Sequence, residues 1–222
     1  MDNLVSRIKA ELERVSWTSS GAHIKTGDVR KIASQAFRSL GDRSKDHVFS
    51  LCEELLEQRS WPMKVIAFGF AYRVCRQYNQ AGFAVFQRWL EEYVRGWGDC
   101  DDFCTHAFGE LICQYPELSR KTLLWTERRE FWLRRAAAVV LIPSIRRGKY
   151  METDPLQVAD LLMQDEHDLV RQGYGWMLKE LFAKEPDLVF TYLRKHRAVM
   201  PRVAFRCALE KLGEERRRIL MQ

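Results

Sequence analysis

The sequence predicts an all-α protein, built as an α-solenoid of antiparallel helix pairs with a concave groove. Three observations carry this prediction. Apolar residues recur at spacings of three and four through nearly the whole chain, which is typical of amphipathic helices, and strand-like alternation is absent. Only 12 glycines and 6 prolines interrupt the 222 residues. Similar segments of small and apolar residues return at intervals that fit one helix pair.

The predicted helices follow one another with short connections, so neighbours should be antiparallel. A first helix covers Leu4–Val15, and a second covers Val29–Leu40 and ends at Gly41. The remaining helices are expected at His47–Gln58, Pro62–Tyr78, Phe83–Val94, Asp101–Tyr115, Leu118–Trp125, Phe131–Ile145, Leu156–Met163, Leu169–Phe182, Leu188–Lys195 and Pro201–Leu212.

A repeat emerges when these helices are aligned. Five similar segments follow Lys64, Asp101, Arg134, Arg171 and Arg202, at intervals of 37, 33, 37 and 31 residues. One such unit cannot bury its apolar face alone, so the units should stack, with one helix of each pair lining the concave side. Small residues in these segments would allow the helices to approach closely: Ala67, Gly69, Ala107, Ala136, Ala137, Gly173, Gly175 and Ala204.

Composition favours a single soluble domain over residues 1–222. The chain is 46% hydrophobic, enough for a sizeable core, and contains no Gly/Ser-rich linker. The longest apolar run, Ala136–Pro143, is too short to span a bilayer, and Met1–Val15 lacks the form of a signal peptide. The net charge of +6 favours a nucleic-acid partner only slightly, because many soluble proteins share it. The arginine-rich segments are better evidence, although solvated helix faces are the alternative. We expect a cytoplasmic monomer.

The six cysteines are scattered through the helical segments. Cys100 and Cys104 lie four residues apart with His106 nearby, but no second pair completes a metal shell. We therefore expect reduced thiols, no metal and no cofactor.

The segment Arg95–Asp102 has the most unusual local sequence. Its glycines break the preceding helix, Asp99 has the position of an N-cap, and Asp102 follows where a capping-box acid belongs. Asp101 then falls in the first helical turn, where the helix dipole favours an ionised carboxylate, and Trp97 lies just before the turn. The alternative interpretation is an ordinary capped helix start with a packing tryptophan.

Two further residues share the spacing of the repeat with Trp97. Of the paired arginines Arg134 and Arg135, only one should face the core side or the concave groove, because successive helical residues point about 100° apart. Trp176 follows two glycines that thin its helix and would expose the indole, although a core tryptophan is the alternative. Trp97, Arg135 and Trp176 lie 38 and 41 residues apart, so they would line one surface. With Asp101 they suit a cationic aromatic ligand attached to a phosphate backbone.

At these residues the sequence resembles the AlkD-like DNA alkylation-repair glycosylases, a family with HEAT-like repeats. The matching elements span nearly the whole chain in the family's order: Ile24-Lys25-Thr26-x-x-x-Arg30, Trp97-x-x-x-Asp101, Trp132-Leu133-x-Arg135-Ala136-Ala137, and Gly175-Trp176-x-Leu178 with Lys184-x-Pro186-Asp187.

The sequence departs from the family in three places. Gly27 replaces the proline of the family's Ile-Lys-Thr-Pro segment, and Ser19-Ser20-Gly21-Ala22 replaces the aromatic residues that usually precede it. These changes put the N-terminal part of the DNA contact in doubt. Gly98 follows Trp97 where many relatives carry an acid, which would loosen that indole.

The resemblance implies a DNA glycosylase that hydrolyses the N-glycosidic bond of cationic N3- or N7-alkylated purines in duplex DNA, in base-excision repair of alkylation damage. It implies Asp101 as the catalytic carboxylate, Trp97 and Trp176 as residues that pack against the lesion nucleotide, and Arg135 as a residue that holds the DNA backbone. It also implies an open groove in place of a pocket for a flipped base. The alternative is a non-catalytic helical-repeat scaffold that binds DNA or a protein.

Overall fold

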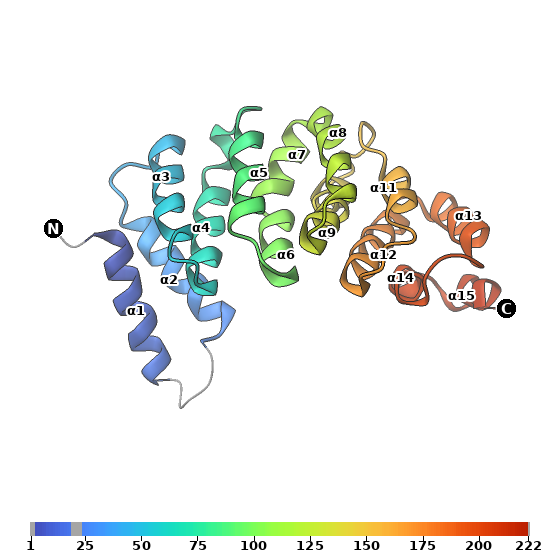
Figure 1. The fold of residues 1–222 in the computed structure, drawn as a ribbon, viewed down its shortest axis with the longest axis horizontal. Coiled ribbons are helices and arrows are strands. Elements are labelled where there is room, and N and C mark those ends of the chain that lie inside the picture. Colours follow the sequence, from blue (N-terminus) through green and yellow to red (C-terminus); the bar gives the residue numbers. More distant parts are fainter. Residues whose placement is uncertain (1–2, 19–23, 222) are drawn as a thin grey trace. The chain divides into compact units, whose positions relative to one another are not determined.

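The computed structural model describes residues 3–18 and 24–221, and all regular structure within these ranges is helical (Figure 1). The predicted all-α class is therefore confirmed. The chain forms two compact units, Met1–Gly82 and Phe83–Gln222. No helix in the described ranges combines the length and the apolar character needed to cross a membrane.

The first unit is built around one apolar helix. Helices α2 and α3 both pack on α4, whose buried residues lie on nearly all of its sides, and α1 packs on α2. The side chain of Gln77 accepts a hydrogen bond from the Lys45 amide at 2.8 Å and donates one to the Arg43 carbonyl at 3.0 Å, which fixes the connection before α3. The elements are α1 (Leu4–Thr18), α2 (Thr26–Arg38), α3 (Lys45–Leu56), α4 (Trp61–Arg73) and the 3-10 helix η1 (Cys75–Gln77).

The second unit carries the remaining elements, and its α5 begins at the last residue of the first unit. They are α5 (Gly82–Glu92), α6 (Trp97–Thr105), α7 (Ala107–Gln114), η2 (Pro116–Leu118), α8 (Ser119–Thr122), η3 (Leu123–Glu127), α9 (Phe131–Val139), α10 (Ile142–Arg146), α11 (Pro155–Leu161), α12 (Asp168–Phe182), α13 (Pro186–His196), α14 (Arg202–Ala208), η4 (Leu209–Lys211) and α15 (Glu214–Met221).

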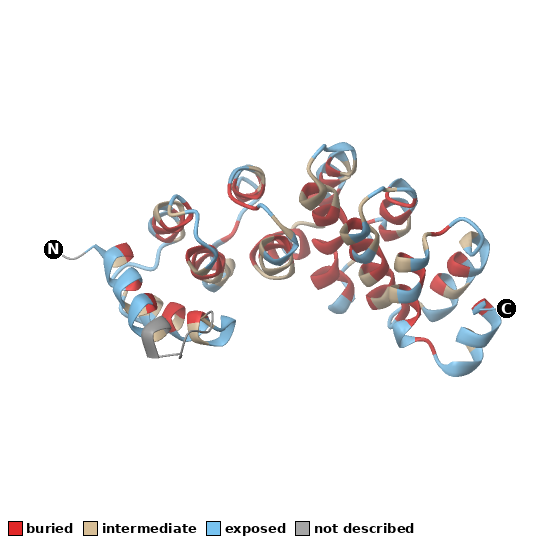
Figure 2. Cartoon of the chain, turned by 60° about the horizontal axis from the view of Figure 1, so that its bottom comes forward, coloured by how far each residue is buried: buried red, intermediate tan, exposed pale blue. Residues whose placement is uncertain are grey.

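Helices α6, α9, α12 and α14 form a row in which each packs on the next. The segments aligned after Asp101, Arg134, Arg171 and Arg202 begin on these four helices in turn, so the repeat is confirmed within this unit, although the first segment continues past His106 into α7. Side chains tie neighbouring repeats at separations of 31 to 35 residues, from the Lys179–Glu210 ion pair to the hydrogen bond from Cys207 Sγ to the Gln172 carbonyl. Figure 2 shows that burial is uneven within this unit: α9 has no exposed residue, whereas most residues of α15, near the C-terminus, are exposed.

Two glycines in α12 let its neighbours come close. A Cβ on Gly173 would lie 3.1 Å from Cγ of Arg135 in α9, and a Cβ on Gly175 would lie 2.6 Å from the Ala204 carbonyl oxygen in α14. Close approach at small residues is therefore confirmed, but the idea that these glycines thin the helix to expose Trp176 is wrong. Both are buried under adjacent helices, as is Tyr174 between them.

Two long predicted helices are each broken into two. His106 has φ −121° and ψ −96°, outside the helical region, and separates α6 from α7. The break folds the chain back so tightly that a Cβ on Gly109 would clash with the Cys104 carbonyl oxygen. The helix predicted over Phe131–Ile145 ends at Val139, and α10 starts with Pro143 in its first turn, where a missing N–H costs nothing.

Candidate functional site

The start of α6 differs from the sequence prediction. Extended Gly96 is the N-cap residue, no side chain caps the helix, and Trp97 is its first residue. The assignment of Asp99 as N-cap is therefore wrong, and Asp101 lies in the second turn instead of the first. Because α6 starts earlier than predicted, Trp97 is part of the same helix as Asp101. Trp97 and Asp101 are four residues apart on one helix, which places them on the same face.

Asp101 forms a bidentate ion pair with Arg135 of the next repeat. Arg135 Nε donates to Asp101 Oδ1 at 2.7 Å, and Arg135 Nη2 donates to Asp101 Oδ2 at 2.8 Å. Arg135 Nη1 donates to the carbonyl of Leu169 at the start of α12. The guanidinium thus connects three helices of the row, and Gly173 provides the space for its stem.

The burial of the two side chains determines which part of this ion pair a ligand can reach. The side chain of Arg135 is 6% exposed and that of Asp101 is 18% exposed. Burial lowers the pKa of Arg135, but the hydrogen bonds and negative charge of Asp101 outweigh it and raise that pKa above its ordinary value. Each Asp101 oxygen accepts one hydrogen bond from the fork, which leaves a further lone pair on each oxygen. The exposed edge of the carboxylate is therefore fixed in place and still able to face a ligand.

The two neighbouring arginines have different partners, but both side chains are largely buried, at 12% exposed for Arg134 and 6% for Arg135. Arg134 instead pairs with Asp165 through Nε at 2.6 Å and donates to the carbonyls of Arg128 and Arg129. Arg135 uses three of its five N–H donors on the protein. Its contact with a DNA backbone stays a prediction.

Trp97 is an accessible indole, 55% exposed, although tryptophan side chains are usually well covered in folded proteins. It is placed near Asp101 by helix register and does not belong to the cavity described next.

Trp176 and Arg135 line the same cavity, of about 750 Å³, formed by α9, α12, α14, η4 and α15. Trp176 is therefore not a core residue, although it is partly covered. Arg135 thus forms an ion pair with Asp101 and lines the same cavity as Trp176. The other cavity residues are Gln172, Lys179, Val203, Arg206, Cys207, Leu209, Glu210, Arg217 and Met221.

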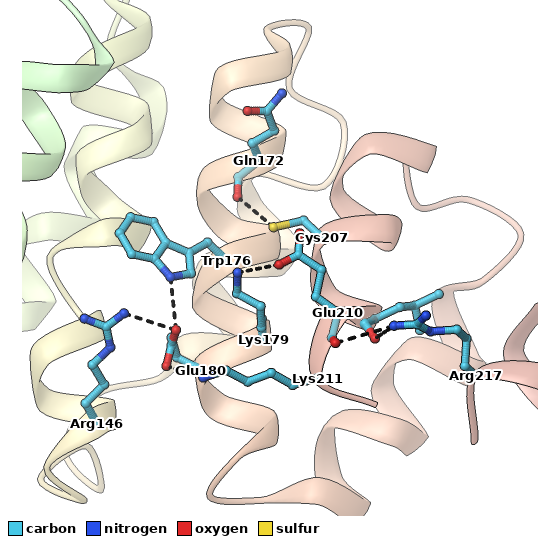
Figure 3. Close-up of polar contacts among 10 residues, drawn as sticks. Arg146, Gln172, Trp176, Lys179, Glu180, Cys207, Glu210, Lys211 and Arg217 are labelled. Atoms are coloured by element: carbon cyan, nitrogen blue, oxygen red, sulfur yellow. Dashed lines mark hydrogen bonds and ion pairs between the residues drawn. The ribbon is translucent and has the colours of Figure 1, made fainter. Parts of the chain in front are cut away.

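Three residues around Trp176 were missed by sequence reasoning. Glu180 accepts hydrogen bonds from the Trp176 indole and from Arg146, both at 3.1 Å, and from Lys211 at 2.8 Å (Figure 3). Burial raises the pKa of Glu180, but these donors and the Arg146 charge outweigh it and lower the pKa to about 2. The available signal was spacing: Glu180 is one helical turn after Trp176 and one repeat from each cation.

The N-terminal motif lies in the other unit. Lys25 and Thr26 are exposed at the start of α2. The divergent segment Ser19–Ala22 lies outside the described residues.

The cysteine and histidine pattern near Asp101 has other partners. Cys100 Sγ donates to the Trp132 carbonyl at 3.4 Å, and His106 Nδ1 lies 2.8 Å from the Asp102 carbonyl oxygen. Burial raises the pKa of the Cys104 thiol well above its ordinary value. Throughout residues 3–18 and 24–221, no group of three or more His, Cys, Asp or Glu is arranged to hold a metal ion.

Comparison with known proteins agrees with this architecture. Residues 22–212 match the sequence model of a family described as DNA alkylation repair enzyme. No curated protein matches the sequence.

Among solved structures, a predicted DNA alkylation repair enzyme from Enterococcus faecalis is similar with a TM-score of 0.72 and 14% identity over 95% of each chain. The protein smu.31 from Streptococcus mutans UA159 has a TM-score of 0.64 and 15% identity over 95% of this chain and 100% of its own. AlkD2 from Streptococcus mutans has a TM-score of 0.63 and 17% identity over 93% of this chain and 99% of its own. At these identities the likeness shows the helical-repeat fold.

Proposed function

The chain belongs to the DNA alkylation repair enzyme family, and from this premise we propose that it is a DNA glycosylase for cationic N3- or N7-alkylated purines in duplex DNA. The observation that carries the proposal is the placement of Asp101. Its carboxylate is held by a buried guanidinium fork, keeps an exposed edge, and shares a helix face with the accessible indole of Trp97.

In the proposed reaction, the bond between C1′ of the deoxyribose and the purine nitrogen breaks, and its electron pair leaves with the base. Because the alkylated purine is cationic, it departs as a neutral molecule and needs no strong general acid. Positive charge develops on the sugar, and the Asp101 carboxylate stabilises it electrostatically. Water then attacks C1′ and forms the new C1′–O bond, while the carboxylate accepts a hydrogen bond from it, and the released proton passes to the solvent.

Trp97, Trp176 and Arg135 would assist this reaction by binding the nucleotide or by holding Asp101. The indoles of Trp97 and Trp176 would attract the cationic nucleotide, with cation–π interactions worth about 0.5–2 kcal/mol each. Arg135 keeps Asp101 in place. Its side chain is only 6% exposed, so any contact with a phosphate of the DNA backbone would have to come through the cavity that it lines.

A second candidate function is a binding scaffold without chemistry. It is favoured by the likeness of the Asp101–Arg135 pair to other ion pairs that tie neighbouring repeats, such as Arg134–Asp165 and Arg147–Glu110. A residue that only ties helices together has no need to face a ligand.

Base release separates the two functions. Duplex DNA containing N7-methylguanine is incubated with the protein, and free base is measured by chromatography against the spontaneous rate. Asp101→Asn should reduce the enzymatic rate by about 100-fold or more, because it removes the charge that opposes the developing cation, and should leave DNA affinity similar or higher.

Asp99→Asn is the matched control, because Asp99 lies on the same helix but points about 200° away from Asp101. Its rate should match the unaltered protein. DNA binding without base release would favour the scaffold, and an unchanged rate in Asp101→Asn would move the catalytic role to another carboxylate.

A further inference from the structure

Glu180 is a buried carboxylate on which three donors from different elements converge. Its side chain is 8% exposed. The Trp176 indole comes from the same helix, Arg146 from the end of α10, and Lys211 from the end of η4 (Figure 3). All three hydrogen bonds lie within 2.8–3.1 Å.

This arrangement differs from an ordinary tie between repeats. Glu110 is also buried and also pairs with an arginine one repeat later, Arg147, at 2.5 Å. Four residues after Glu110, however, its helix neighbour is Gln114, which donates to it at 2.8 Å. Four residues before Glu180 stands Trp176, an aromatic residue that lines the cavity. The same kind of carboxylate therefore holds an indole in one repeat and an amide in another.

The contacts restrict the orientation of the indole. An indole has a single N–H donor, so its hydrogen bond to Glu180 fixes the ring's rotation about the side-chain bonds. The Arg146 guanidinium carbon lies 5.6 Å from the ring centre, held there by the same carboxylate. The ring is thus oriented before any ligand arrives, which lowers the entropy lost on binding.

The charges also matter for a cationic ligand. Arg146 and Lys211 are close to Trp176 and remain about half exposed, at 48% and 43% of their side chains. Without Glu180, two uncompensated positive charges would stand beside the indole and repel a cationic base. The carboxylate offsets them while the cations stay open to phosphates.

We propose that Glu180 is a positioning residue that orients the Trp176 indole, with Arg146 and Lys211, for contact with the lesion nucleotide. This inference rests on the proposed glycosylase function for its ligand, but the orientation of the ring does not depend on catalysis. The two statements are therefore tested separately.

The first test observes the ring without DNA. The indole N–H signals of the 7 tryptophans are recorded in nitrogen–proton spectra, and the Trp176 signal is assigned by its loss in Trp176→Phe. In Glu180→Gln the Trp176 signal should shift and its proton should exchange faster with water. In the control Glu110→Gln, which removes a buried carboxylate elsewhere, it should not move. An unmoved signal in Glu180→Gln would overturn the proposal.

The second test is a double-mutant comparison of N7-methylguanine release. Glu180→Gln should lower kcat/KM by about tenfold when Trp176 is present, and by less than twofold in Trp176→Phe, whose ring cannot donate to residue 180. Equal losses in both backgrounds would mean that Glu180 only supports the fold, and would also overturn the proposal. If the unaltered protein releases no base, the glycosylase assignment fails, and the spectra still decide whether Glu180 orients the indole.

Discussion

Asp101 and Arg135 show how one contact can serve stability and chemistry together. The fork orients the carboxylate, and its burial makes each partner depend on the other. Arg135→Ala leaves a largely buried carboxylate without its cation, so the free energy of unfolding should fall by about 3–5 kcal/mol, measured by chemical denaturation. Arg135→Lys should recover only part of this loss, because lysine cannot supply a bidentate fork. A loss below about 1 kcal/mol in Arg135→Ala would show that the pair contributes little to the fold.

Glu180 gives a pH-dependent signature at the same scale. Its folded pKa is about 2, below the ordinary value of 4.5, so the ionised group stabilises the folded state above pH 4.5. That contribution is lost as the pH falls from about 4.5 towards 2. The stability difference between the unaltered protein and Glu180→Gln should therefore be constant from pH 5 to 8 and should shrink by pH 3. Denaturation at pH 7 and pH 3 measures it, and equal differences at both would contradict the depressed pKa.

Single residues were predictable where the repeat period places them. The spacing placed Trp97, Arg135 and Trp176 on three successive helices of the row, α6, α9 and α12, but that the three line one surface stays a prediction. The pairing of Arg135 with Asp101 was not predicted. The cap assignment of Asp99 was wrong because an extended glycine can start a helix without a side-chain cap. Glu180 was not predicted because its spacing from Trp176, Arg146 and Lys211 does not by itself show that the three side chains meet at one carboxylate.

At the scale of helices, glycine controls how closely neighbours pack. Gly175→Ala would place a Cβ 2.6 Å from the Ala204 carbonyl oxygen, so α12 and α14 must separate, and stability should fall by about 1–3 kcal/mol. Gly98→Ala in α6 meets no atom within 4 Å and should be neutral or stabilising by up to about 1 kcal/mol. Thermal unfolding compares the two variants. Equal effects would show that close packing at Gly175 is not the cause.

The periodicity of apolar residues predicted that these segments are helical, but it did not predict where two of the helices break. The apolar pattern continues across His106 and across the segment before Pro143, because the pieces on both sides face the same core. The close approach of Gly109 to the Cys104 carbonyl is a tertiary contact that periodicity does not record. Helix α15 was not predicted at all, since Leu220 is its one buried residue among those described.

For the whole molecule, the number of domains that unfold as independent units is a prediction still to be tested. The sequence predicts one domain over residues 1–222, and the structure contains two compact units, Met1–Gly82 and Phe83–Gln222. Because no flexible linker interrupts the sequence, heating should produce one cooperative transition, with equal calorimetric and van't Hoff enthalpies. Scanning calorimetry measures both quantities. Two separated transitions would show that the units unfold independently and would refute the single domain.

The division of the Asp101–Arg135 pair between successive repeats has a consequence for protein engineering. Neither repeat holds a complete site, so a single repeat cannot be grafted or exchanged as a functional module. A chimaera cut between α6 and α9 would keep the carboxylate from one parent and its cation from the other, and would need both parents to share the same register. The smallest transplantable piece that keeps this carboxylate fixed is therefore the run of consecutive repeats from α6 to α12.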